Sequence, residues 1–188
     1  MVKLLGLSGS LRPASYNSAL LRAATRLMPA DAQLAVASIR DIPLYDGDLE
    51  AQGVPPAVVQ LKDAVVAAAG VLLVTPEYNN SIPGVFKNAI DWLSRPNTDI
   101  RRVFTGRPFA VIGASPGGFG TTLSQAAWLP VLRTLGAQLW AGGRLQVSRA
   151  GSVFDEAGNL KDSSVEQQLK QFLAGYVEFV RRGAGSSA

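Results

Sequence analysis

The fold is decided by residues 3–18, which read Lys3-Leu4-Leu5-Gly6-Leu7-Ser8-Gly9-Ser10-Leu11-Arg12-Pro13-Ala14-Ser15-Tyr16-Asn17-Ser18. The apolar run at residues 3–7 predicts a short buried strand, and apolar residues at helical spacing follow from Leu20 onward. A hydroxyl-rich loop lies between them. A strand, loop and helix in this order aim the free N–H groups and the positive end of the helix at the carboxyl edge of the strand. This arrangement predicts an anion-binding site.

The side chains of this loop favour phosphate as the anion. The serine hydroxyls, including Ser10, Ser15 and Ser18, can donate hydrogen bonds to phosphate oxygens. The guanidinium group of Arg12 can add two parallel charged bonds. The loop therefore predicts a site for one terminal phosphate and, with it, a nucleotide-like ligand.

Strands and helices are expected to alternate along the rest of the chain. The expected strands are residues 3–7, 33–38, 71–75, 109–114 and 138–140, the last of which could continue to 147. The expected helices are residues 17–28, 56–69, 83–94, 120–135 and 163–182. Pro130 is expected to kink or break the fourth helix, and residues 181–188 are expected to form a frayed polar tail.

This alternation predicts one domain over residues 1–188, of the α/β class. Five parallel strands covered by helices on both faces form a three-layer sandwich. The common solution is the flavodoxin-like fold, with its five-stranded parallel sheet in the order 2-1-3-4-5. Its ligands bind beyond the carboxyl ends of the strands, at the switch point between strands one and three.

The loops after strands three and four have unusual compositions, as this fold requires. Residues 75–84 carry a carboxylate, a phenol and two amides between two prolines, and residues 114–121 are rich in glycine. Tyr78 could lie against a planar ligand, and Asn79 could hydrogen-bond a ring edge. The alternative is that the first loop is a tight turn capped by Asn and Ser, and that the second is a plain strand-to-helix turn.

Composition excludes several classes of chemistry. The sequence has no cysteine and no histidine, so disulfides, thiol nucleophiles and imidazole bases are excluded, and we expect no metal site. The net charge of +4 is modest, and we expect no nucleic-acid partner. A group of arginines indicates a solvated loop or, as the alternative, a binding site for a small anion; its members are Arg95, Arg101, Arg102 and Arg107.

The absence of targeting segments and of known phosphate-binding motifs narrows the possible location and the possible ligands. Residues 108–132 carry no charge, but their glycines, proline and hydroxyls are unlike a membrane helix, so we expect no membrane insertion and a cytoplasmic location. Neither G-x-x-x-x-G-K-[ST] nor G-x-G-x-x-G after a strand is present. A site for a mononucleotide with one phosphate fits better, and in this fold that ligand is most often FMN.

Two long motifs resemble a known family. Residues 9–17 (Gly-Ser-Leu-Arg followed by Ser15 and Asn17) and residues 75–92 (Thr-Pro-Glu-Tyr-Asn, then Lys-Asn-Ala-Ile-Asp-Trp) are similar to the NAD(P)H-dependent FMN reductases. That family includes bacterial quinone, chromate and azo-dye reductases. Residues 41–46 and 106–108 also resemble it, and the similarity is clear from residue 3 to about residue 115.

The resemblance implies roles for individual residues. It implies that the FMN phosphate is held by Ser10, Arg12, Ser15, Asn17 and Ser18. It implies that Pro76, Glu77, Tyr78 and Asn79 border the isoalloxazine ring and ribityl chain, and that Ser115 and Gly118 close the other side. No protein side chain is expected to be catalytic, since the chemistry takes place on the flavin. The resemblance also implies a homodimer or homotetramer with the flavin near the subunit interface.

The expected activity is that of an FMN-dependent oxidoreductase. NAD(P)H would bind transiently and reduce the flavin, and quinones, flavins, azo dyes or chromate-like oxyanions would then take the electrons in a ping-pong scheme. The alternative is a flavodoxin-type electron carrier that does not turn over NAD(P)H. Flavodoxins tend to be acidic, and the basic charge of this chain argues against that alternative.

Overall fold

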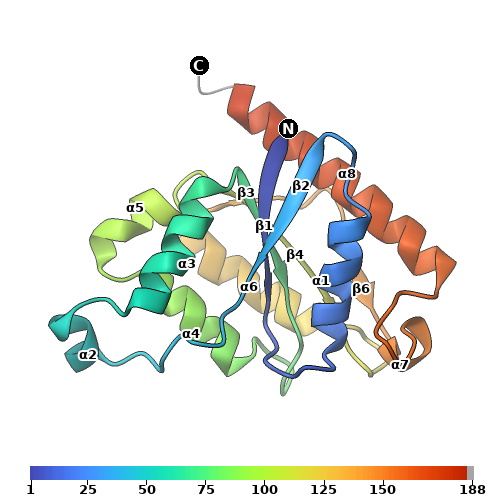
Figure 1. Cartoon of the computed structure of the whole chain (residues 1–188), viewed down its shortest axis with the longest axis horizontal. Coiled ribbons are helices and arrows are strands. Elements are labelled where there is room, and N and C mark those ends of the chain that lie inside the picture. The colour runs from blue at the N-terminus through green and yellow to red at the C-terminus, as the bar shows by residue number, and fades with distance from the viewer. Residues whose placement is uncertain (186–188) are drawn as a thin grey trace.

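The computed structural model describes residues 1–185 of the chain and shows a parallel sheet between two layers of helices (Figure 1). The strands are β1 (Val2–Ser8), β2 (Ala32–Ala37), β3 (Gly70–Val74), β4 (Pro108–Ala114), β5 (Gln138–Leu139) and β6 (Gln146–Val147). All pairings are parallel, in the order β2-β1-β3-β4-β5, with β6 also on β4. The predicted flavodoxin-like order is confirmed.

Nine helical segments connect or follow the strands in the described residues. They are α1 (Tyr16–Arg26), α2 (Gly47–Gln52), α3 (Pro56–Ala67), α4 (Gly84–Leu93), the 3-10 turn η1 (Asn97–Asp99), α5 (Ile100–Val103), α6 (Thr122–Thr134), α7 (Ala150–Val153) and α8 (Ser163–Gly185). The long ones, α1, α3, α4, α6 and α8, are the five expected from the sequence. No helix among residues 1–185 has the length and apolar character needed to cross a membrane.

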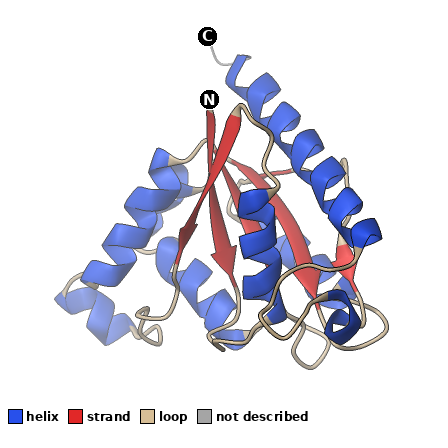
Figure 2. Cartoon of the chain, turned by 45° about the vertical axis from the view of Figure 1, so that its right-hand side comes forward, coloured by secondary structure: helices blue, strands red, loops and turns tan. Residues whose placement is uncertain are grey.

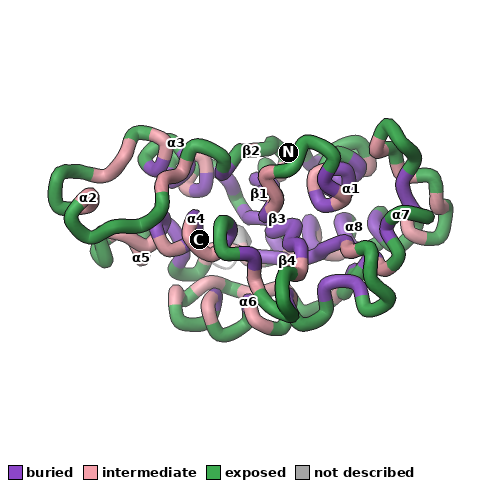
Figure 3. The backbone as a smooth tube through the Cα atoms, turned by 90° about the horizontal axis from the view of Figure 1, so that it is seen from below, coloured by how far each residue is buried: buried purple, intermediate pink, exposed green. Residues whose placement is uncertain are grey.

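The two faces of the sheet are covered by different helices (Figure 2). On one face, Leu72 and Ile112 pack with residues of α1 and α8. On the other, Leu73 and Phe109 pack with residues of α3, α4 and α6. Figure 3 shows the buried residues concentrated in the central strands and the helix sides that face them. Alternate residues of each strand therefore supply two separate cores, as expected for a sheet buried on both faces.

The fifth strand is interrupted rather than continuous. β5 pairs with Pro108 and Phe109 at the start of β4, and β6 pairs with Gly113 and Ala114 at its end. Residues 140–145 lie between them and belong to neither strand. The strand expected at residues 138–140 is therefore confirmed as β5, and its possible continuation to residue 147 is a separate short strand, β6.

Two expectations about chain ends and breaks need correction. Pro130, which was expected to kink or break its helix, does not break it, because α6 continues to Thr134. Proline removes the hydrogen bond to the carbonyl four residues earlier, here that of Ala126. Both residues are exposed, so water can bind the freed carbonyl. The expected tail also begins too early, because α8 continues through Arg181 and Arg182 to Gly185. The rest of that tail, residues 186–188, lies outside the described residues.

Helix α8 is fastened to the middle of the sheet by a buried phenol. The hydroxyl oxygen of Tyr176 lies 2.9 Å from the carbonyl oxygens of both Val71 and Pro108, on β3 and β4. The side chain is fully buried, and burial raises the pKa of Tyr176 well above its usual value. Because the neutral hydroxyl is a donor, it adds a hydrogen bond to backbone carbonyls of two neighbouring strands, which fixes α8 to the sheet.

A buried amide ties the first turn of α1 to the end of β4. Asn17 Nδ2 donates to the carbonyl oxygen of Ala114 at 2.8 Å, and Asn17 Oδ1 accepts from the amide of Ala114 at 2.9 Å. Asn17 is only 4% exposed. One side chain therefore satisfies both peptide groups of the last residue of β4, at the edge where ligands are expected.

We expect Asn17→Ala to lower the free energy of unfolding by about 2–4 kcal/mol, since two buried backbone groups lose their partners. Urea denaturation followed by circular dichroism measures this. Asn88 of α4 is a matched control because its side chain also bridges two backbone groups. These groups belong to Pro43 and Tyr45, which lie in a more exposed loop. Asn88→Ala should cost about 1 kcal/mol or less. Equal losses in the two variants would contradict the role assigned to Asn17.

Candidate functional site

The first loop is organised by serine hydroxyls at the start of α1. Ser15 is the N-cap of the helix, and its Oγ accepts from the amides of Asn17 at 3.2 Å and Ser18 at 3.3 Å. The Oγ atoms of Ser8 and Ser18 lie 3.0 Å apart. Ser10 Oγ is 3.4 Å from the amide of Arg12 and accepts its hydrogen bond. These contacts fix the loop around the positive end of α1.

A cleft of about 370 Å³ opens beside this loop, between α1 and the end of β2. Three of the five predicted phosphate-binding residues line it, namely Ser10, Arg12 and Ser18. The other two, Ser15 and Asn17, are buried beneath it. Their side chains bond to protein backbone, as helix cap and tie to β4, so they shape the loop from below.

Two further arginines line the cleft that the sequence analysis did not select. Arg22 lies four residues after Ser18 on α1, and Arg40 follows the end of β2. The Arg40 guanidinium donates to the carbonyl oxygen of Leu11, which joins the first loop to β2. The helical spacing from Ser18 could have indicated Arg22. No aspartate or glutamate is among the residues that line the cleft.

The loop after β3 is a tight two-residue turn, in agreement with the alternative considered above. The amide of Tyr78 donates to the carbonyl oxygen of Ser81 at 3.1 Å, and the amide of Ser81 donates back to Tyr78 at 3.0 Å. Asn79 and Asn80 both have positive φ, at 49° and 61°. This conformation favours asparagine. It leaves the Tyr78 side chain 46% exposed at the sheet edge, free to contact a ligand.

Glu77 holds this loop against α6. Its Oε2 accepts from the amides of Leu123 at 2.8 Å and Ser124 at 3.0 Å, at the start of the helix. A carboxylate at a helix N-terminus satisfies free N–H groups and complements the helix dipole. Glu77 therefore positions the loop that carries Tyr78, while the preceding Pro76 is buried at the end of the strand.

The loop after β4 is held from the side of β6 and α7. The amide of Ser115 donates to the carbonyl oxygen of Val147 at 2.9 Å. The amide of Ala150 donates to the carbonyl oxygen of Ser115 at 3.0 Å. Arg149 has a φ of 48° and its amide donates to the carbonyl oxygen of Gly117 at 2.9 Å. Gly118 is exposed, with open space where a Cβ would stand. The loop thus leaves its backbone accessible.

The three loops follow β1, β3 and β4, so they lie at the same edge of the parallel sheet, at the bottom of the view in Figure 1. The cleft at the first loop is not lined by residues 76–79, Ser115 or Gly118. The structure therefore brings the predicted phosphate-binding residues together around a cleft. It places the predicted ring-binding residues on the open edge beside it.

The arginine-rich region at residues 95–107 mainly serves the protein itself. Arg95 pairs with Glu50 at 2.8 Å, and Arg102 lies 3.3 Å from Asp63. Arg107 donates to the carbonyl oxygen of Val103 at 2.8 Å. Glu50 carries a lowered pKa, chiefly because Arg95 donates a hydrogen bond to its carboxylate. These internal partners favour a structural role over a landing site for a small anion.

Comparison with known proteins agrees with this geometry. The sequence model of the family described as NADPH-dependent FMN reductase matches residues 2–152. A Pseudomonas aeruginosa protein named NAD(P)H-dependent FMN reductase is 42% identical over 184 residues, covering 98% of each chain. A Burkholderia 2-hydroxy-1,4-benzoquinone reductase is 36% identical over 173 residues, covering 92% of this chain and 93% of the relative.

A solved structure is similar over nearly the full length. FerB, a flavoenzyme NAD(P)H:(acceptor) oxidoreductase from Paracoccus denitrificans, superposes with a TM-score of 0.88 at 32% identity. The match covers 97% of this chain and 99% of FerB. The sheet order, the loop at the first strand and these matches lead to one conclusion: the chain belongs to the NADPH-dependent FMN reductase family.

Proposed function

We propose that this protein is an FMN-dependent NAD(P)H oxidoreductase that passes electrons to quinones, flavins, azo dyes or chromate-like oxyanions. The observation that carries the proposal is the cleft at the first loop, where Ser10, Arg12 and Ser18 meet beside the N-terminus of α1. One relative is named an NAD(P)H-dependent FMN reductase and another a 2-hydroxy-1,4-benzoquinone reductase, which supports the same chemistry here.

The residues of the first loop fit the phosphate of FMN. Among the described residues, the Arg12 guanidinium has no hydrogen-bond or ion-pair partner, and Ser10 uses its hydroxyl only as an acceptor. Both groups therefore have donors to spare for a phosphate, in a cleft without carboxylates. Ser15 and Asn17 would act beneath them by holding the start of α1 in place.

The loops after β3 and β4 would border the flavin ring. Tyr78 offers an exposed aromatic face, and Asn79 offers amide groups at the tip of a rigid turn. Ser115 and Gly118 would close the opposite side, where the absence of a Cβ at Gly118 allows close approach. Glu77 would keep the first of these loops fixed to α6, so that the ring meets a preformed surface.

When bound, FMN supplies the redox chemistry, accepting a hydride from NAD(P)H and passing two electrons to the acceptor. The protein's part is to bind, orient and tune. Because Tyr78 and Gly118 stand on an open edge, NAD(P)H and the acceptor can use the same face in turn. This accounts for a site in which no histidine or cysteine is available.

We also propose a cytoplasmic homodimer or homotetramer. Exposed apolar side chains support an interface near the proposed flavin site. Leu44 is 79% exposed, and Val85 is 36% exposed on α4. The loop at residues 43–45 is bonded to α4 through Asn88, so the two surfaces are neighbours. Lys87 instead pairs with Asp91 within α4 at 2.7 Å, the intrahelical contact that its spacing predicts.

Anaerobic reduction by NADPH tests the proposed activity. The protein is reconstituted with FMN, mixed with NADPH without oxygen, and followed at the long-wavelength flavin band. We expect rapid bleaching, followed by recovery of the band when a benzoquinone is added. A protein that retains FMN but is not bleached by NADPH or NADH would instead be a flavodoxin-type carrier.

Substitution of Arg12 tests the phosphate site. We expect Arg12→Gln to weaken FMN binding roughly tenfold or more, because a charged hydrogen-bond partner of the phosphate is lost. Fluorescence titration of the apoprotein with FMN measures the dissociation constant. Arg26→Gln, at the exposed far end of α1, is the matched control and should leave FMN affinity unchanged. Unaltered affinity in Arg12→Gln would remove the first loop from the FMN site.

A further inference from the structure

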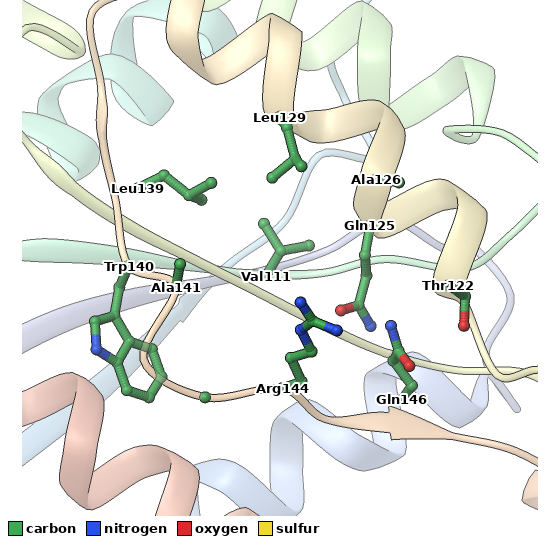
Figure 4. A pocket seen from close by; sticks show the side chains of 11 residues that line it. Val111, Thr122, Gln125, Ala126, Leu129, Leu139, Trp140, Ala141, Arg144 and Gln146 are labelled. Carbon is green, nitrogen blue, oxygen red and sulfur yellow. The ribbon is translucent and has the colours of Figure 1, made fainter.

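The interruption of the fifth strand creates a second cavity, of about 280 Å³, at the outer edge of β4. Helix α6 forms one wall and residues 139–146 form the other (Figure 4). None of its lining residues lines the cleft at the first loop. It is therefore a separate feature from the proposed flavin site.

The backbone of β4 is left unpaired in this cavity. Phe109 and Gly113 bond outward, since the Phe109 carbonyl oxygen accepts from Trp140 and the Gly113 amide donates to Leu145. Ile112 bonds the other way, to Thr75 beyond the end of β3. By this alternation the peptide groups of Val111 point into the gap. Within residues 1–185, no backbone group pairs with them there.

Two side chains bring further polar groups to the same place. Gln125 Nε2 donates to Thr121 Oγ1 and to the carbonyl oxygen of Leu145, both at 3.0 Å, which holds the side chain at the cavity. The Arg144 guanidinium has neither an ion-pair nor a hydrogen-bond partner in the described part of the chain. Figure 4 shows the ends of these two side chains lying in the same part of the cavity, close to Val111.

The rest of the lining is uncharged and mostly apolar, with Thr122 and Gln146 as its other polar side chains. Leu129 of α6, Leu139 of β5 and the side chain of Val111 surround the upper part of the cavity in Figure 4. Arg144 is the one charged residue in the lining, and no carboxylate offsets it. A ligand that fits must therefore combine an apolar body with a single negative group.

We propose that this cavity binds a small flat aromatic carboxylate, about the size of a naphthoate. The ring would lie against Leu129 and Leu139, and the carboxylate would accept hydrogen bonds from Arg144 and from the free amide of Val111. The cavity volume of about 280 Å³ is just below the range for small-molecule sites, which begins at about 300 Å³. An apolar pocket with a few converging polar groups is the usual form of such a site.

The test is a titration of the FMN-loaded, ¹⁵N-labelled protein with 2-naphthoate, followed by amide chemical shifts. We expect saturable shifts at Val111, Gln125 and the Trp140 indole, and none at Ser10 or Arg12. The uncharged 2-naphthamide should bind more weakly. Arg144→Gln should weaken 2-naphthoate roughly fivefold to tenfold and leave 2-naphthamide unchanged, because only the carboxylate uses the guanidinium.

Two control variants make the result decisive. Arg133→Gln removes an exposed arginine from the far end of α6 and should bind 2-naphthoate normally. Ala126→Phe fills the cavity and should abolish binding of both probes while FMN is retained. The proposal is overturned if the shifts do not saturate, if they fall on the flavin-site loops, or if Arg144→Gln binds as the unaltered protein does. Shifts at these residues that follow protein concentration without any probe would also overturn it, since a second copy would then cover the cavity.

Discussion

The edge of the sheet that carries the proposed site depends on the double hydrogen bond between the Asn17 side chain and the backbone of Ala114. Asn17 stands in the first turn of α1 and Ala114 is the last residue of β4, so this contact sets the distance between the first and last of the three loops. Glu77 makes the second such tie, between the loop after β3 and the start of α6. Together they make a preformed edge from segments far apart in the sequence, as precise ligand placement requires.

The sequence predicted the sheet well because its strands are nearly continuous apolar runs. Residues 4–7 and 71–75 are buried, as expected for parallel strands covered on both faces, and their continuous apolar runs differ from the pattern of a solvent-exposed helix. The strand order then fixed which loops share an edge, and the tight turn at Asn79 follows from local turn chemistry. The same reasoning brought Ser10, Arg12 and Ser18 to one cleft.

The features that the sequence did not predict depend on contacts between residues far apart in the chain. The pattern of residues does not show that Asn17 and Glu77 face protein backbone, since a free side chain and a bonded one look alike in sequence. Nor does it show that Arg40 turns back to Leu11. Pro130 was expected to kink or break α6, but the helix continues to Thr134, and Pro130 lies where the freed carbonyl side of the helix is exposed to solvent. The break between β5 and β6 likewise depends on tertiary pairing with β4, to which local propensity gives no guide.

Helix α8 packs Leu169, Phe172, Leu173 and Tyr176 into one of the two cores. It follows every strand in chain order, yet the face that it covers belongs to strands made much earlier. During synthesis on the ribosome, the side of β3 and β4 that Tyr176 closes must therefore stay bare until α8 emerges. Nascent chains with such uncovered apolar sheets are prone to aggregate. The sheet is thus most vulnerable just before its last helix docks, and that interval is when a chaperone would be of most use.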